Sequence, residues 1–357
     1  MTKKRKDIDY KTYLQLPELL AAQKPISAAH DEMLFVIVHQ TYELWFKQVL
    51  FEVARVQGIF ARKTLADRDL RTVSAGLERC AAILKHLVRQ VDLLETMTPL
   101  DFLDFRHVFR SASGFQSLQF RALEIGLGLR EEDRVTYDGK PYASYLSAED
   151  QKEIRKMEKG GSLFGQVDRW LARTPFVSMD GFDFWSAYRR AVAAMLKSDR
   201  AAARADRSLT PAAREAALAK TDNTQMQFDA LFESDAAREK NPWRLSPQAL
   251  KAALFIMLYR DQPVLQAPFA ILNALMDIDE TMTLWRFRHA QMVQRMLGMK
   301  MGSGSSSGHD YLARTTEKSR IFRDFFALST FMIPRSGLPE LPRAVEEKMG
   351  FAYGGAI

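Results

Sequence analysis

Long segments of helical periodicity are the feature that most limits how this chain can fold. From Ser27, a residue suited to cap a helix, apolar residues recur three and four positions apart to about residue 60. A second segment of this kind covers residues 67–94, and a third, residues 265–300, carries His289. Segments with this pattern bury one face in a helical core, so the sequence predicts an all-α fold.

Shorter helices are expected between these segments. Thr98, Pro99 and Asp101 combine an N-cap, a proline at the first helical position and an acidic residue at the third, which predicts a helix start. The alanine-rich and charged stretch at residues 201–220 suits a solvent-facing helix pair or a mobile connection. Further helices are expected from about residue 115, from residue 147 to the glycines at 160–161, and from residue 246.

Composition excludes several classes of protein. The 357 residues, 47% of them hydrophobic, are enough for a packed core. The most apolar stretch, near residues 252–258, is far shorter than the roughly 20 residues of a membrane-spanning helix, and no apolar run of signal-peptide type is visible. We therefore expect a soluble cytoplasmic protein with no membrane partner. The single cysteine, Cys80, leaves only histidines and carboxylates as candidate metal ligands.

The formal net charge of +7 does not by itself indicate nucleic-acid binding. Lysine and arginine are mixed with aspartate and glutamate along the periodic segments, and no basic stripe alternates with aromatic residues. No nucleic-acid partner is expected. The basic run at residues 3–6 predicts a disordered tail, with a phosphate-binding arm as the alternative.

Two of the six histidines lie on apolar helix faces. His289 shares its face with a tryptophan and two methionines, which is where an axial haem ligand would lie; the alternative is a core histidine with one hydrogen bond. His39 shares a face with Phe35 and Phe46, for which an amphipathic helix with one buried polar residue is the alternative. A third possibility is a non-haem iron site at residues 30–32 together with His39, although the spacing matches no recognised motif.

Arg106 also lies among apolar neighbours, Phe102 and Phe109. A guanidinium in such surroundings needs an acidic partner, either a protein carboxylate or the carboxylate of a ligand. Its planar fork suits a small carboxylate, so an amino acid or keto acid would be a natural ligand. The Gly/Ser segment at residues 302–308, directly after the His289 helix, is either a linker or a closing lid.

Six blocks of the chain form a recognisable series: HDEMLFVIVHQTYELWFK at 30–47, ETMTP at 95–99, DFR at 104–106, SGFQSLQFR at 113–121, DID at 277–279 and LWRFRH at 284–289. Taken in this order, the blocks resemble the tryptophan 2,3-dioxygenase family. The resemblance extends from about Tyr10 to Arg335. The segment 137–242, which contains Trp170 and Arg173, looks like the longer, animal-type members rather than the shorter bacterial ones, and a second ligand site near Trp170 is left open.

The resemblance implies an all-helical haem protein, typically a homotetramer built as a dimer of dimers. It would use ferrous haem b and O2 to open the pyrrole ring of L-tryptophan, giving N-formylkynurenine. His289 matches the family's proximal haem ligand, His39 matches the distal histidine that hydrogen-bonds the indole nitrogen, and Arg106 matches the residue that pairs with the substrate carboxylate. The other implied residues are Phe35, Val36, Ile37, Val38 and Phe102 around the indole, Ser303 at the substrate ammonium and carboxylate, Ser113 and Arg121 at the haem edge, and Tyr10 and Tyr13, which would reach a neighbouring subunit's site.

The expected organisation is a basic tail at 1–8, one helical domain at 9–335 with an accessory region at about 137–242, and a C-terminal tail at 336–357. The family usually has a threonine and two glycines where this chain has Ser303, Gly304 and Ser305, which puts substrate affinity and stereoselectivity in question. Two alternatives share the fold: a haem enzyme that hydroxylates or oxidises another aromatic substrate, and a haem sensor without turnover.

Overall fold

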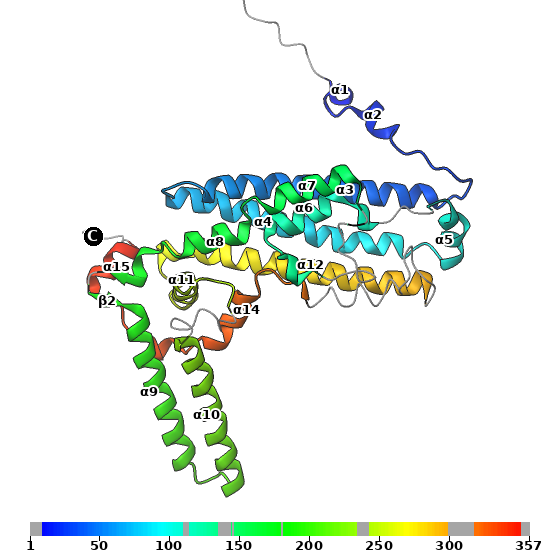
Figure 1. Ribbon diagram of the computed structural model, residues 1–357. Helices are drawn as coiled ribbons and strands as arrows, with labels where there is room; N and C mark the ends of the chain where they lie inside the picture. Colours follow the sequence, from blue (N-terminus) through cyan, green and yellow to red (C-terminus); the bar gives the residue numbers. More distant parts are fainter. Residues whose placement is uncertain are drawn as a thin grey trace, which may run out of the picture.

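The computed structural model describes residues 9–109, 114–134, 144, 146–179, 181–233, 243–298 and 318–350. These residues form a helical protein, as the periodicity predicts (Figure 1). Strand structure in the described ranges is limited to one antiparallel pair, β1 (Ser178–Met179) and β2 (Phe182–Asp183). Within the same ranges, no helix has the length and apolar content needed to cross a membrane.

Three long helices form the body of the molecule: α3 (Glu32–Phe60), α4 (Asp67–Leu94) and α12 (Gln266–Leu297). They lie side by side, and α4 packs against both of the others (Figure 1). Helices α3 and α4 are antiparallel. Helices α4 and α12 run parallel, as two ion pairs in the same order along both helices show. Lys85 pairs with Asp277, and further along Asp92 pairs with Arg288.

Helix α5 (Pro99–Arg106) begins where the sequence predicts. The Thr98 side chain accepts the Asp101 backbone N–H, and the Asp101 carboxylate accepts the Thr98 N–H at 2.8 Å. This reciprocal capping satisfies two backbone donors that the helix itself leaves without partners. A local sequence signal therefore determines where α5 starts.

Two predicted helix starts differ from the structure. The first long helix begins at Glu32 rather than Ser27, because the Glu32 carboxylate accepts the backbone N–H groups of Ile26 and Ser27 and holds them in a turn outside the helix. The helix predicted from residue 115 begins as α6 (Leu118–Leu127), after the short turn η2 (Gly114–Gln116).

Helix α6 ends at Gly128, whose φ is +117°. A Cβ atom at this position would lie 2.7 Å from the Cβ of Phe164. Glycine is therefore required both by the left-handed backbone and by the close approach of α8 (Leu163–Leu171).

The accessory region contains a helical hairpin, α9 (Phe184–Ala205) and α10 (Pro211–Glu233), which projects from one end of the body (Figure 1). The sequence left two predictions open for residues 201–220, a helix pair or a mobile connection, and the structure has the helix pair. Tyr188, Phe228 and Phe232 are buried at its base, whereas the outer turns of both helices contain no buried residue.

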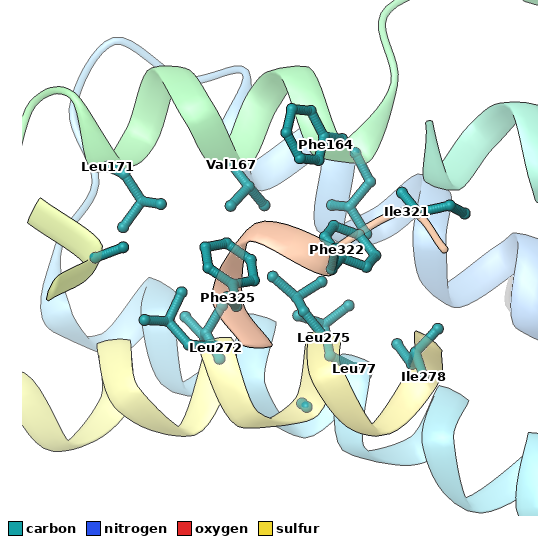
Figure 2. Packing of buried hydrophobic residues seen from close by; sticks show 14 of the residues in the cluster. Leu77, Phe164, Val167, Leu171, Leu272, Leu275, Ile278, Ile321, Phe322 and Phe325 are labelled. Carbon is teal, nitrogen blue, oxygen red and sulfur yellow. The ribbon is translucent and has the colours of Figure 1, made fainter. Parts of the chain in front are cut away.

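Residues 321–328 pass between two helices inside the hydrophobic core. Figure 2 shows Phe322 and Phe325 lying between the apolar residues of α8 and those of α12. Both rings are fully buried, and Phe325 belongs to α14 (Arg323–Leu328). The Asp279 carboxylate holds this segment by accepting the backbone N–H groups of Ile321 and Phe322 at 2.8 and 3.0 Å.

The C-terminal tail expected from residue 336 is instead packed as far as residue 350. Helix α15 (Arg343–Met349) buries Val345 and Met349 completely, because these two apolar side chains meet the core cluster. The expected basic tail at 1–8 and residues 351–357 lie outside the described residues. The remaining elements are α1 (Tyr10–Tyr13), α2 (Leu16–Leu20), η1 (His107–Phe109), η3 (Glu131–Asp133), α7 (Ala148–Glu158), η5 (Pro175–Val177), α11 (Pro247–Leu258), η7 (Pro263–Leu265), η8 (Ser329–Phe331) and η9 (Arg335–Gly337).

Candidate active site

A cavity of about 950 Å³ lies among α3, α5, α6, α12 and the end of α4. Its volume is near the upper end of the range for small-molecule sites, roughly 300–1,000 Å³. Most of its wall is apolar. The residues that line the cavity include Phe35, Ile37, His39, Gln40, Phe102, Arg121, Glu124, Trp285, Arg286 and His289.

His289 faces this cavity from α12, one helical turn after Trp285. The two ring centroids are 5.2 Å apart, and the buried His289 Nδ1 has no hydrogen-bond partner among the residues that the structure describes. Burial, together with the nearby His39, lowers the pKa of His289 to about 4. The imidazole is therefore neutral at pH 7, which is the form that binds a metal ion.

His39 faces the same cavity from α3. Its Nδ1 lies 2.7 Å from the Phe35 carbonyl oxygen, and because a carbonyl only accepts, Nδ1 must carry the proton. Burial lowers the pKa of His39, although the Phe35 carbonyl and the Glu43 carboxylate oppose this effect. A neutral His39 with its proton on Nδ1 has an unprotonated Nε2, which can accept a hydrogen bond from a ligand.

A group of aromatic rings lies on one side of His39. The Phe35 ring lies 4.0 Å from the His39 ring, 4.9 Å from the Phe109 ring and 5.8 Å from the Phe102 ring, measured between centroids. These contacts join α3 to α5 and η1, so Phe35, His39 and Phe102 lie in one group. The cluster makes this part of the cavity flat-sided and apolar, which suits an aromatic ligand.

Other predicted residues are placed differently. Ile37 lines the cavity, but Val38 is buried in the core and Val36 is not a wall residue, because consecutive helix positions point in different directions. Arg106 is the partly buried last residue of α5 and is not among the described wall residues. Ser113 and Ser303, like Gly304 and Ser305, lie outside the described residues.

The predicted N-terminal tyrosines are not among the described wall residues of this cavity. Tyr10 and Tyr13 lie on α1, are 74% and 73% exposed, and stand apart from the helical body (Figure 1). Residues 19–23, which follow them, do reach the cavity: Gln40 on α3 donates to the Ala22 carbonyl, and the Gln23 amide donates to Gln40. The sequence pattern gave no sign of this contact, because residues 19–23 lie outside the periodic segments.

A buried charged cluster forms one edge of the cavity. The Glu124 carboxylate accepts from Arg121 of α6 and from Arg286 of α12, each at 2.9 Å, and all three residues are buried. Burial raises the pKa of Glu124, but the two arginines together outweigh this effect, so the pKa of Glu124 is lowered and its carboxylate is charged. The cluster therefore places the guanidinium groups of Arg121 and Arg286 at this edge, and such groups suit an acidic ligand group.

Sequence reasoning identified Arg121 in this cluster but missed Glu124 and Arg286. A signal existed for both, since Glu124 follows Arg121 by three positions on one helix and Arg286 precedes His289 by three. Their pairing across 162 positions of sequence was not visible locally.

The non-haem iron alternative finds no support in the described part of the chain. No group of three or more His, Cys, Asp or Glu side chains there could hold a metal ion. His30 is fully exposed, and the Glu32 carboxylate is used by the backbone of residues 26 and 27.

Comparison with known proteins agrees with this geometry. The family model described as tryptophan 2,3-dioxygenase matches residues 2–332. Similar curated proteins include tryptophan 2,3-dioxygenase of Bdellovibrio bacteriovorus, 49% identical over 97% of this chain and 99% of the relative, and that of Dictyostelium discoideum, 42% identical over 98% and 90%. Tryptophan 2,3-dioxygenase B of Danio rerio is 40% identical over 94% of this chain and 84% of the relative.

These matches also bear on the accessory region at about 137–242. The expected likeness to animal members is confirmed, but a bacterial relative matches the same nearly full length, so the longer form is not confined to animals. With the family model and these relatives covering almost the entire sequence, this chain belongs to the tryptophan 2,3-dioxygenase family.

Proposed function

We propose that this protein is a haem-dependent dioxygenase that opens the indole pyrrole ring of L-tryptophan with O2 and gives N-formylkynurenine. This reaction is the first step of tryptophan catabolism by the kynurenine route. One observation carries the proposal: two neutral histidines, His39 on α3 and His289 on α12, face one apolar cavity in a chain of this family.

The cavity residues fit haem b. His289 presents a neutral imidazole in an apolar wall, and no described residue hydrogen-bonds its buried Nδ1. Arg121 and Arg286, at one edge of the cavity, suit the acidic edge of such a cofactor, where Ser113 would also lie. Haem bound through His289 would supply the iron chemistry that activates O2.

The protein's own contribution is to bind and orient L-tryptophan. His39 Nε2 accepts the indole N–H and so fixes the ring in the cavity, without needing to act as a strong base. Phe35, Ile37 and Phe102 pack against the indole and exclude water. Arg106 binds the substrate carboxylate, and Ser303 holds the ammonium and carboxylate groups. Val36 and Val38 support α3, the helix that carries Phe35, Ile37 and His39.

The proposed assembly is a homotetramer built as a dimer of dimers. Tyr10 and Tyr13 support it, because two large aromatic side chains are exposed on a short helix that stands apart from the body. In the assembly they would reach the site of a neighbouring subunit. A single species of four chains in an analytical ultracentrifuge is the expected result, and a monomer with full activity would refute this part of the proposal.

The test of the reaction is the mass of the product formed by haem-loaded, reduced protein from L-tryptophan and O2. A product heavier by two oxygen atoms is expected. A product with one added oxygen would indicate a hydroxylating relative, and no product despite a normal haem spectrum would indicate a sensor or another substrate. His289→Ala should lose the haem absorption band while keeping the helical circular dichroism spectrum. His39→Ala should keep the band and lose turnover.

A further inference from the structure

We propose that Arg288 is a positioning residue for this reaction. It ties the turn of α12 that carries His289 to the corner between α4 and α5, and thereby sets the distance between the cofactor side and the substrate side of the cavity. This inference rests on the proposed function, because it concerns the placement of His289 relative to Phe102 and Arg106.

Arg288 directly precedes His289 and bridges two carboxylates at the end of α4. Its Nη2 lies 2.7 Å from Asp92 Oδ1 and 3.1 Å from Glu95 Oε2. The Arg288 side chain is 34% exposed and that of Glu95 is 20% exposed, so water screens the second contact only in part. The bridge is therefore stronger than an ion pair between fully exposed side chains.

The position of Glu95 makes this bridge relevant to the substrate side. Glu95 is the C-cap of α4, and Thr98, three residues later, is the N-cap of α5. Phe102 and Arg106 lie on α5, so a shift of the corner at Glu95 moves both. The ion pair between Glu95 and Arg288, the residue before His289, therefore connects the α5 wall of the cavity to the α12 wall.

The bridge also compensates an unfavourable arrangement of charge. The carbonyl groups at the end of α4 give that end partial negative charge, and Asp92 and Glu95 add to it. Arg288 is the cation that offsets this charge. Without it, the two carboxylates and the helix end would repel one another, and the corner would move away from its present position.

The chain offers a matched control in the same pair of helices. Lys85 of α4 pairs with Asp277 of α12 at 3.3 Å, and the two side chains are 58% and 49% exposed. Asp277 precedes Arg288 by eleven residues on α12, which is about 16 Å along the helix. Loss of this pair should weaken the contact between α4 and α12 without disturbing the corner or His289.

The experiment compares Arg288→Gln, Arg288→Lys and Lys85→Gln with the wild type, all as the haem-loaded full chain. Haem dissociation is measured by transfer to excess apomyoglobin, and L-tryptophan affinity by the shift of the haem absorption band. For Arg288→Gln we expect about fivefold faster haem loss and about fivefold rises in Kd and KM for L-tryptophan, with kcat changed less than about twofold. Arg288→Lys should restore haem loss and L-tryptophan affinity most of the way to the wild-type values. Lys85→Gln should stay within about twofold of the wild type in both measurements.

Two results would overturn the inference: equal behaviour of Arg288→Gln and Lys85→Gln in haem loss and tryptophan affinity, or a fall in kcat with unchanged KM. Failure of the proposed function is a separate outcome. A wild type that binds haem but forms no ring-opened product would refute the reaction, and the haem-loss comparison would then still decide whether Arg288 positions His289.

Discussion

Replacing Glu124 with glutamine tests the buried charged cluster at the cavity edge. The side chains of Glu124, Arg121 and Arg286 are 7%, 9% and 3% exposed, so the substitution leaves two buried cations without their shared anion. Removing one partner of a buried ion pair costs about 3–5 kcal/mol. Glutamine keeps the volume of the side chain and one acceptor oxygen, so we expect a loss near the lower limit, about 3 kcal/mol.

The assay is urea unfolding at pH 7 and one fixed protein concentration, followed by circular dichroism. Glu347→Gln is the matched control, because it also removes a glutamate paired with an arginine, Arg343, but both side chains are largely exposed. Its free energy of unfolding should change by less than about 0.5 kcal/mol. A loss below about 1 kcal/mol for Glu124→Gln would refute the view that this carboxylate holds the two arginines.

The pH dependence gives a second check on the same variant. The pKa of Glu124 is lowered in the folded protein. The contribution of its charged carboxylate to folding stability is therefore fully present above the ordinary pKa of 4.5 and is lost as pH falls through the lowered pKa of the folded state. The stability difference between wild type and Glu124→Gln should therefore be constant from pH 7 to about pH 5 and should narrow in more acidic solution. A stability difference that grows as pH falls would contradict the conclusion that folding lowers the pKa of Glu124.

Three further substitutions test the site and the core. Arg106→Ala should raise KM for L-tryptophan at least about 30-fold while leaving the haem band unchanged, since loss of a charge partner costs about 2–5 kcal/mol; an unchanged KM would remove Arg106 from the substrate site. Gly128→Ala should lower the free energy of unfolding by about 1–3 kcal/mol, because φ is +117° and the new Cβ would meet Phe164 at 2.7 Å; an unchanged urea midpoint would contradict this. Phe325→Ala should cost about 3–5 kcal/mol because the ring is fully buried, whereas Met226→Ala on exposed α10 should cost less than about 0.5 kcal/mol; equal losses would show that the packing in Figure 2 does not govern stability.

Local signals accounted for much of the secondary structure. The capping residues Thr98 and Asp101 predicted the start of α5, and the periodic segment at residues 67–94 predicted both ends of α4. These signals are readable because the interacting groups are within four residues of one another. The start of α3 was missed, because the backbone groups of Ile26 and Ser27 bind the side chain of Glu32 instead of continuing the helix.

The site was predictable in its residue types but not in its arrangement. Helical spacing placed Phe35 beside His39 and Trp285 beside His289, and the resemblance to one family indicated that the two histidines share a cavity. Spacing could not show that the Phe35 carbonyl sets the proton position on His39, nor that Val38 turns to the core while Ile37 lines the cavity.

The sequence by itself determined the helical class, several helix boundaries and the family, since these depend on neighbouring residues and on blocks of sequence in a given order. Only the tertiary structure decided the pairing of Glu124 with Arg286, the bridge from Arg288 to the end of α4, and the burial of Val345 and Met349. Each of these depends on the packing of segments far apart in the chain. Such contacts follow from the burial of apolar faces against one another, and no local pattern specifies which distant side chain a buried charge will meet.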